Sequence, residues 1–176
     1  MDSNLFSFEL VDEYTPEIVI KKELKQIEEA TKHYVTGELS EYQGEIHSYT
    51  KEVGFSAAIK ALQESKTIDV DIQEELGELS NESHRYEVFL KVRFMDNYKY
   101  RLMFVDYGAV SYPVTIILNE ELAEEYSETV RDYFLIDSMK ELENLLNKVI
   151  NSRKLHRIIQ NLINESIRRE NTKKNE

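Results

Sequence analysis

The sequence contains no cysteine. This absence excludes a disulfide framework, zinc or iron–sulfur sites held by thiolates, and catalysis by a thiol nucleophile. A chain without cysteine fits a reducing compartment, and we expect a cytoplasmic location.

Long apolar runs are missing as well. No segment approaches the roughly 18 consecutive apolar residues that a membrane span requires. The first residues, MDSNLFSFELVDE, have neither the basic start nor the apolar run of a secretory leader. We therefore expect no membrane among the partners of this chain.

Glycine and proline are scarce, with five and two residues respectively. Multi-turn all-β and linker-rich chains use both residues at their turns, so this scarcity favours helices and a few strands. The 41% of hydrophobic residues can form a core, and folded domains cluster at about 100 to 200 residues. We predict a single α+β domain over residues 1–170 and a frayed polar tail over residues 171–176.

Positive charge is also in short supply, because the formal net charge is −12. Residues 151–176 carry seven Lys or Arg against three Glu, a balance of +4, which leaves −16 for the rest of the chain. Such a body repels nucleic acid over a Debye length of about 8 Å. We predict a basic protein partner and no direct nucleic-acid binding, the alternative being that the acidity only maintains solubility.

The N-terminal quarter contains two elements and one ambiguous segment. Weak alternation predicts a short strand over Leu5–Val11, and Thr15 before Pro16 predicts the start of a helix. The apolar stripe of that helix recurs at helical spacing, as Ile20, Leu24, Ile27 and Thr31.

Residues 34–53 have the apolar spacing of a helical seam, but two glycines interrupt it. Each of Gly37 and Gly44 would cost about 1 kcal/mol inside a helix relative to alanine. We favour two short strands, around Tyr34–Tyr42 and Glu45–Thr50, over one helix.

Three shorter patterns follow. Phe55–Glu64 has the apolar face of a short helix, Thr67–Ile72 alternates strictly and predicts a strand, and Gln73–His84 is polar and acidic and predicts a connecting loop. The strand places Asp69 and Asp71 on one face.

Those two aspartates are followed closely by Glu74 and Glu75. Oxygen ligands of this kind can hold a hard cation, but the glycine and further ligands of an EF-hand loop are missing. A solvated, acidic strand face that meets a protein partner is the interpretation we favour, and whether a metal binds stays open.

The clearest pattern is an antiparallel meander over residues 86–118, with the strands YEVFLKVRF, YKYRLMFV and YPVTIIL. Turns are predicted at Asp96–Asn97 and Asp106–Gly108. In the first strand the apolar residues Val88, Leu90, Val92 and Phe94 share one face. The charged residues on the other face predict a half-exposed sheet.

The last third is predicted to be helical. One helix is expected over Asn119–Phe134, a second from Asp137–Ser138 to Ile150, and a third over Leu155–Ile167. The predicted fold is an antiparallel sheet of four to six strands, with one face covered by the N-terminal helix and the C-terminal helices.

Catalytic patterns are absent from the sequence. The four histidines lie too far apart for a zinc helix motif, and no glycine-rich phosphate loop or nucleophile elbow occurs. Glu87 and Lys91 are four residues apart, where a metal-dependent nuclease would need two. We expect no cofactor.

The string FVDYG, Phe104–Gly108, resembles the strand-and-turn signature of Tudor domains over five residues. The resemblance implies an aromatic cage for a methylated cation, with Tyr107 and either Phe104 or Tyr112 at the matching positions. Ala109 and the flanking helices depart from that family. We favour an ordinary β-turn with packed tyrosines.

Eleven tyrosines favour a binding surface, because the ring has an apolar body and a polar tip. The candidate partner-binding residues are Asp69, Asp71, Glu74, Glu75, Tyr98, Tyr100, Tyr107 and Tyr112. We predict a non-enzymatic protein-interaction module, an inhibitor or regulator of a basic, nucleic-acid-handling protein, as mobile-element proteins can be. The alternatives are a metal-dependent enzyme with a carboxylate site and an oligomeric scaffold, a homodimer through the C-terminal helices.

Overall fold

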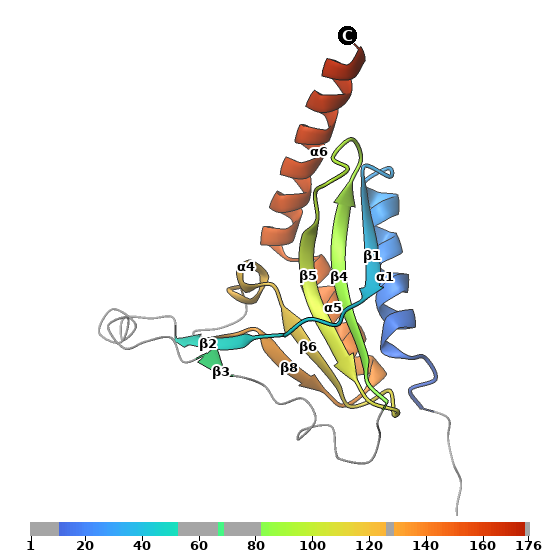
Figure 1. The fold of residues 1–176 in the computed structure, drawn as a ribbon, viewed down its shortest axis with the longest axis vertical. Helices are drawn as coiled ribbons and strands as arrows, with labels where there is room; N and C mark the ends of the chain where they lie inside the picture. Colours follow the sequence, from blue (N-terminus) through green and yellow to red (C-terminus); the bar gives the residue numbers. More distant parts are fainter. Residues whose placement is uncertain (1–10, 53–66, 69–81, 126–128, 175–176) are drawn as a thin grey trace, which may run out of the picture.

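The computed structural model describes residues 11–52, 67–68, 82–125 and 129–174. It has an α+β fold in which helices cover one face of a five-stranded antiparallel sheet (Figure 1), as predicted. The strand order is β1-β4-β5-β6-β8, and a small second sheet has the order β3-β2-β7. The strands are β1 (Val35–Glu41), β2 (Ser48–Glu52), β3 (Thr67–Ile68), β4 (His84–Val92), β5 (Tyr100–Tyr107), β6 (Val114–Leu118), β7 (Thr129–Arg131) and β8 (Tyr133–Ile136).

Helix α1 (Pro16–Ala30) begins where the sequence predicts, with Thr15 as its N-cap residue and proline in its first turn. Its predicted stripe is buried and joins the core through Ile20, Leu24 and Ile27. The helix packs along β1, the edge strand of the large sheet (Figure 1).

The preference for strands in the ambiguous segment 34–53 is confirmed by β1 and β2. Gly37 explains why a glycine interrupts the apolar pattern there. A Cβ atom at this position would lie 2.6 to 2.9 Å from side-chain atoms of Leu24. The glycine therefore allows α1 to approach the sheet closely.

The predicted meander is confirmed as β4, β5 and β6, paired antiparallel. A register shift after the Val88–Met103 pair makes Leu102 an extra residue in β5, and its side chain joins the core. Phe94 does not extend the apolar face of β4, because the strand ends at Val92 and Phe94 has a left-handed backbone with φ 63°.

Two details of the meander prediction are wrong. Strand β5 continues through Asp106 to Tyr107, so the turn begins later than expected. The second face of the sheet is not simply half-exposed, because Phe89 and Ile117 on that face are 2% and 3% exposed. Part of this face is covered by the segment between β1 and β2.

The helix predicted over Asn119–Phe134 is wrong. Asn119 does cap a helix, but α4 (Glu120–Ala123) is only four residues long, and the chain then forms β7 and β8. Strand β8 pairs with β6 and places Ile136 beside Val114. Burial at the sheet edge outweighs the helical spacing of the apolar residues, since local propensity is a weak preference.

The two C-terminal helices are confirmed as α5 (Met139–Ile150) and α6 (Arg153–Lys174). The Ser138 side chain caps α5 by accepting a hydrogen bond from the Glu141 backbone N–H at 3.3 Å. Helix α6 is longer than expected and continues past the end of the strands (Figure 1). It includes residues 171–174, which were expected to fray.

Several predicted elements lie outside the described residues. They are the strand over Leu5–Val11 apart from its last residue, the helix over Phe55–Glu64, the strand over Thr67–Ile72 beyond β3, and most of the acidic loop. Among the helices that the structure does describe, none combines the length and the apolar character needed to cross a membrane.

Candidate functional site

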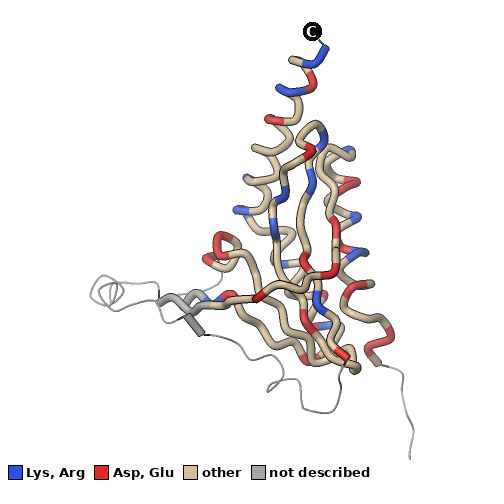
Figure 2. Tube along the Cα trace, in the orientation of Figure 1, with Lys and Arg blue, Asp and Glu red and all other residues tan. Residues whose placement is uncertain are grey.

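Acidic residues gather on α4, beside one end of β5 and β6 (Figure 2). The Asn119 side chain accepts a hydrogen bond from the Glu121 backbone N–H at 2.9 Å and donates one to the Arg101 carbonyl at 3.0 Å. These two bonds fix the start of α4 against β5, and acidic residues in a first helical turn are favoured by the helix dipole. The acidic residues on and directly after α4 are Glu120, Glu121, Glu124 and Glu125.

A hollow of about 430 Å³ lies between α4 and the second face of β5 and β6. Its apolar walls include Phe104 and Ile117. Carboxylates from Glu120, Glu121 and the buried Asp132 also line it. The site therefore combines apolar contact surface with negative charge.

Arg101 lies within this site and places a guanidinium group on the aromatic wall of the hollow. The Arg101 guanidinium is 4.6 Å from the centroid of the Phe104 ring, and its Nη1 is 3.6 Å from Glu87 Oε1. Attraction between a guanidinium and an aromatic face is a favourable contact. The ring of Phe104 is therefore already covered by a cation of the chain itself, and the carboxylates of Glu120 and Glu121 are not used by Arg101.

Of the predicted tyrosines, Tyr100 borders this hollow, and Tyr98 precedes it in the chain and lines a second hollow at the β4–β5 turn. The Tyr100 hydroxyl donates a hydrogen bond to Glu121 Oε2 at 3.3 Å. Burial, and then the negative charge of Glu121, raises the pKa of Tyr98 and Tyr100 above the usual value for tyrosine. Both hydroxyls therefore stay protonated at neutral pH and keep a proton to donate.

The other two predicted tyrosines lie at a different place, near the start of α1. Tyr107 is only 3% exposed, and its hydroxyl donates to the Glu17 carboxylate. The Tyr112 hydroxyl donates to the Tyr14 carbonyl at 3.3 Å, and burial raises its pKa to about 12. The four tyrosines thus do not form one binding surface.

The Tyr107–Glu17 pair is electrostatically coupled. Burial raises the pKa of Tyr107, and the neighbouring Glu17 raises it further. Burial alone would raise the pKa of Glu17 as well, but the hydrogen bond from Tyr107, together with a backbone hydrogen bond and smaller favourable contacts, outweighs burial, and the pKa of Glu17 is lowered. His84 stacks on Tyr107 with ring centroids 4.9 Å apart.

The residues that match a Tudor cage do not form one. Phe104 pairs with Glu87 and Tyr107 pairs with His84, so the two rings lie on opposite faces of β5. Phe104 packs instead against Tyr42, with ring centroids 4.6 Å apart. The segment fits the interpretation favoured from the sequence, an ordinary turn with packed tyrosines.

A buried ion pair was missed by sequence reasoning. Asp106 is 1% exposed and accepts a hydrogen bond from Arg85 Nε at 2.8 Å, while Arg85 Nη1 donates to the Gly44 carbonyl at 3.3 Å. Burial raises the pKa of Asp106, and Arg85 offsets this only in part. The pair fixes the segment between β1 and β2 across the sheet, and His47 of that segment lines the hollow.

The acidic candidates Asp69, Asp71, Glu74 and Glu75 lie outside the described residues. Within the part of the chain that the structure describes, no three His, Asp or Glu side chains lie close enough together to hold a metal ion.

Comparison of the chain with protein-family models, with curated proteins and with solved structures found no match.

Proposed function

We propose that the chain is a protein-interaction module that binds a basic partner through the hollow beside α4. We call this site the α4 acidic surface and define it by Tyr100, Glu120, Glu121 and Asp132. Its partner residue would be an arginine or lysine that enters the hollow.

The observation that carries the proposal is the combination of apolar walls and carboxylates in one hollow. Arginine and lysine have an aliphatic stem and a charged head, so they need both kinds of surface. The stem would lie against the partly exposed ring of Tyr100 at the edge of the hollow, and the head would pair with Glu120 or Glu121. Charge-assisted hydrogen bonds of this type are stronger than neutral ones.

The proposed class of partner is a nucleic-acid-handling protein, which this chain would inhibit or regulate. The net charge of −12 supports this, because surfaces that bind nucleic acid are basic and would be attracted by such a field. The proposal therefore implies that nucleic acid and this chain compete for the same partner surface.

The hollow can be tested directly with a short capped peptide that contains one arginine. Titration into the ¹⁵N-labelled chain is expected to shift the backbone amide signals of Tyr100, Glu120 and Glu121. The same peptide with glutamate in place of arginine is expected to leave these signals unchanged, because the carboxylates repel it.

Two double variants test the site. The first carries Glu120→Gln and Glu121→Gln, and the second, its control, carries Glu13→Gln and Glu29→Gln. Both change the net charge by the same amount, but Glu13 and Glu29 are exposed and lie away from the hollow. The first variant should lose the peptide shifts and the second should keep them. Equal shifts in both variants would contradict the proposed site.

A further inference from the structure

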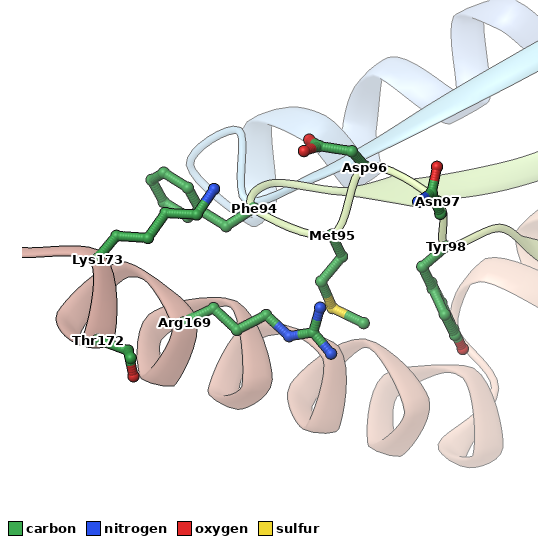
Figure 3. Close-up of a pocket in the computed structure, with 8 residues that line it drawn as sticks. All are labelled: Phe94, Met95, Asp96, Asn97, Tyr98, Arg169, Thr172 and Lys173. Atoms are coloured by element: carbon green, nitrogen blue, oxygen red, sulfur yellow. The ribbon is translucent and has the colours of Figure 1, made fainter. Parts of the chain in front are cut away.

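A second hollow, of about 660 Å³, lies between the β4–β5 turn and the last turns of α6 (Figure 3). We call it the turn pocket. It is lined by Phe94–Tyr98 from the turn and by Arg169, Thr172 and Lys173 from the helix. Its volume falls within the roughly 300–1,000 Å³ range of small-molecule sites.

The two walls of the turn pocket are tied together by hydrogen bonds. The buried Ser166 hydroxyl of α6 donates to the Arg93 carbonyl at 2.6 Å, next to the turn. The Tyr34 hydroxyl donates to Glu170 Oε2 on the same helix at 3.5 Å. The long helix is therefore held beside the turn where the pocket opens.

The backbone of Phe94 places an aromatic ring among cations. Its φ of 63° is rare for a bulky residue, and such conformations concentrate at ligand-binding and catalytic sites. The ring centroid is 4.9 Å from the Arg93 guanidinium and 5.7 Å from Lys173 Nζ. Phe94 thus keeps two positive charges beside the pocket.

Some of the cations around the pocket have no direct carboxylate partner, although the charge of Arg93 lowers the pKa of the nearby Glu170. Among the described residues, Arg93, Lys99 and Lys173 make no ion pair, although the chain has 34 acidic residues against 22 Lys and Arg. Arg169 Nε donates to Glu165 Oε1 at 2.9 Å, and its two terminal nitrogens have no partner in the described part of the chain.

Figure 3 shows how the charged groups are arranged. The Arg169 side chain extends toward Met95, and the Lys173 amine approaches Phe94. The carboxylate of Asp96 points away from α6, on the other side of the turn. The α6 wall of the turn pocket therefore offers two cationic side chains, Arg169, which is paired on one side with Glu165, and Lys173.

From this arrangement we propose that the turn pocket binds a small phosphorylated metabolite of about nucleotide size. Guanidinium and ammonium groups are the side chains best suited to phosphate oxygens. Arg169 and Lys173 would hold the phosphate, while the rest of the ligand contacts Met95 and Tyr98. This goes beyond the proposed function, since the ligand has the opposite charge and meets different residues.

Calorimetric titration of the full chain with inorganic phosphate, ribose 5-phosphate and adenosine 5′-monophosphate tests the proposal. At least one organic phosphate is expected to bind about tenfold more tightly than inorganic phosphate. Arg169→Gln with Lys173→Gln should weaken that binding roughly 10- to 100-fold, because charged hydrogen bonds are lost.

The matched control is Arg153→Gln with Arg157→Gln, which changes the charge equally at the exposed start of the same helix. Its affinity should stay within about twofold of wild type. The proposal would be overturned if both variants lost affinity equally, or if all three probes bound with equal affinity. It would also be overturned if no probe bound, or if only a single-stranded DNA oligonucleotide bound. None of these results depends on the arginine-peptide titration of the α4 acidic surface.

Discussion

Single residues in this protein pair their buried polar groups across elements that are distant in sequence. Tyr107 donates to Glu17 of α1, and Arg85 donates to the buried Asp106. An unpaired buried polar group costs about 1 to 3 kcal/mol, so these pairs secure α1 and the β1–β2 segment to the sheet. The Tyr107 pair also gives the stability of the protein a defined pH dependence.

Replacing Tyr107→Phe is expected to lower the free energy of unfolding by about 1 to 2 kcal/mol at neutral pH, since a hydrogen bond to a charged group is lost. The pKa of Glu17 is lowered in the folded state from 4.5. Its contribution is therefore present above pH 4.5 and disappears as the pH falls through the folded pKa. Urea unfolding near pH 7 and well below pH 4.5 should show a large loss only at neutral pH.

Tyr112→Phe is the control for this measurement. The Tyr112 hydroxyl donates to a backbone carbonyl, so its loss should destabilise the protein by a similar amount at both pH values. A Tyr107→Phe variant whose loss does not change between the two pH values would show that Glu17 does not carry the effect.

Which tyrosines could bind a partner was only partly predictable at this scale. Tyr98 borders the turn pocket and Tyr100 borders the hollow beside α4, whereas Tyr107 is buried. A tyrosine ring suits a core as well as an interface, so residue type alone does not separate the two. The Arg85–Asp106 pair was missed because the strand register that joins it is not visible in the local pattern.

Elements were predictable where the local signals agreed with one another. Helix α1 has a proline start and a regular stripe, and α5 has a Ser138 cap and a regular stripe. The prediction over Asn119–Phe134 was wrong because its local pattern is helical while β6 offers an open edge to pair with. Tertiary pairing decided this segment, and no single-sequence pattern reports it.

The packing of α1 on β1 depends on Gly37. Gly37→Ala is expected to reduce the free energy of unfolding by about 1 to 3 kcal/mol, because the new methyl group would overlap Leu24 near its backbone. Chemical denaturation measures this loss. Leu24 cannot move away without shifting α1.

Gly44→Ala is the comparison for this variant. A Cβ there would meet only the outer end of the Tyr42 ring. This ring packs on Phe104 but is partly exposed and can shift with its loop, so the cost should stay below that of Gly37→Ala. If Gly44→Ala proved as costly as Gly37→Ala, the close approach of α1 to the sheet would not explain the first result.

In the described part of the molecule, residues of one charge gather at two places. Figure 2 shows acidic residues around α4 and basic residues along β4 and β5 toward their shared turn. The chain total of −12 follows from the sequence, but both hollows depend on how α4, α6 and the turn meet. The sequence therefore predicted a charged interaction protein, while the α4 acidic surface and the turn pocket required the fold.

We propose that the α4 acidic surface binds a basic partner in the cell. The most direct test is affinity capture of the tagged chain from its own cells, at low and high salt, with and without added DNA. We predict that one basic protein is retained at low salt and is released by high salt or by DNA. The double variant Glu120→Gln with Glu121→Gln should no longer retain this protein. The double variant Glu13→Gln with Glu29→Gln should still retain it. A captured protein that resists salt and DNA and binds both variants equally would contradict the claim.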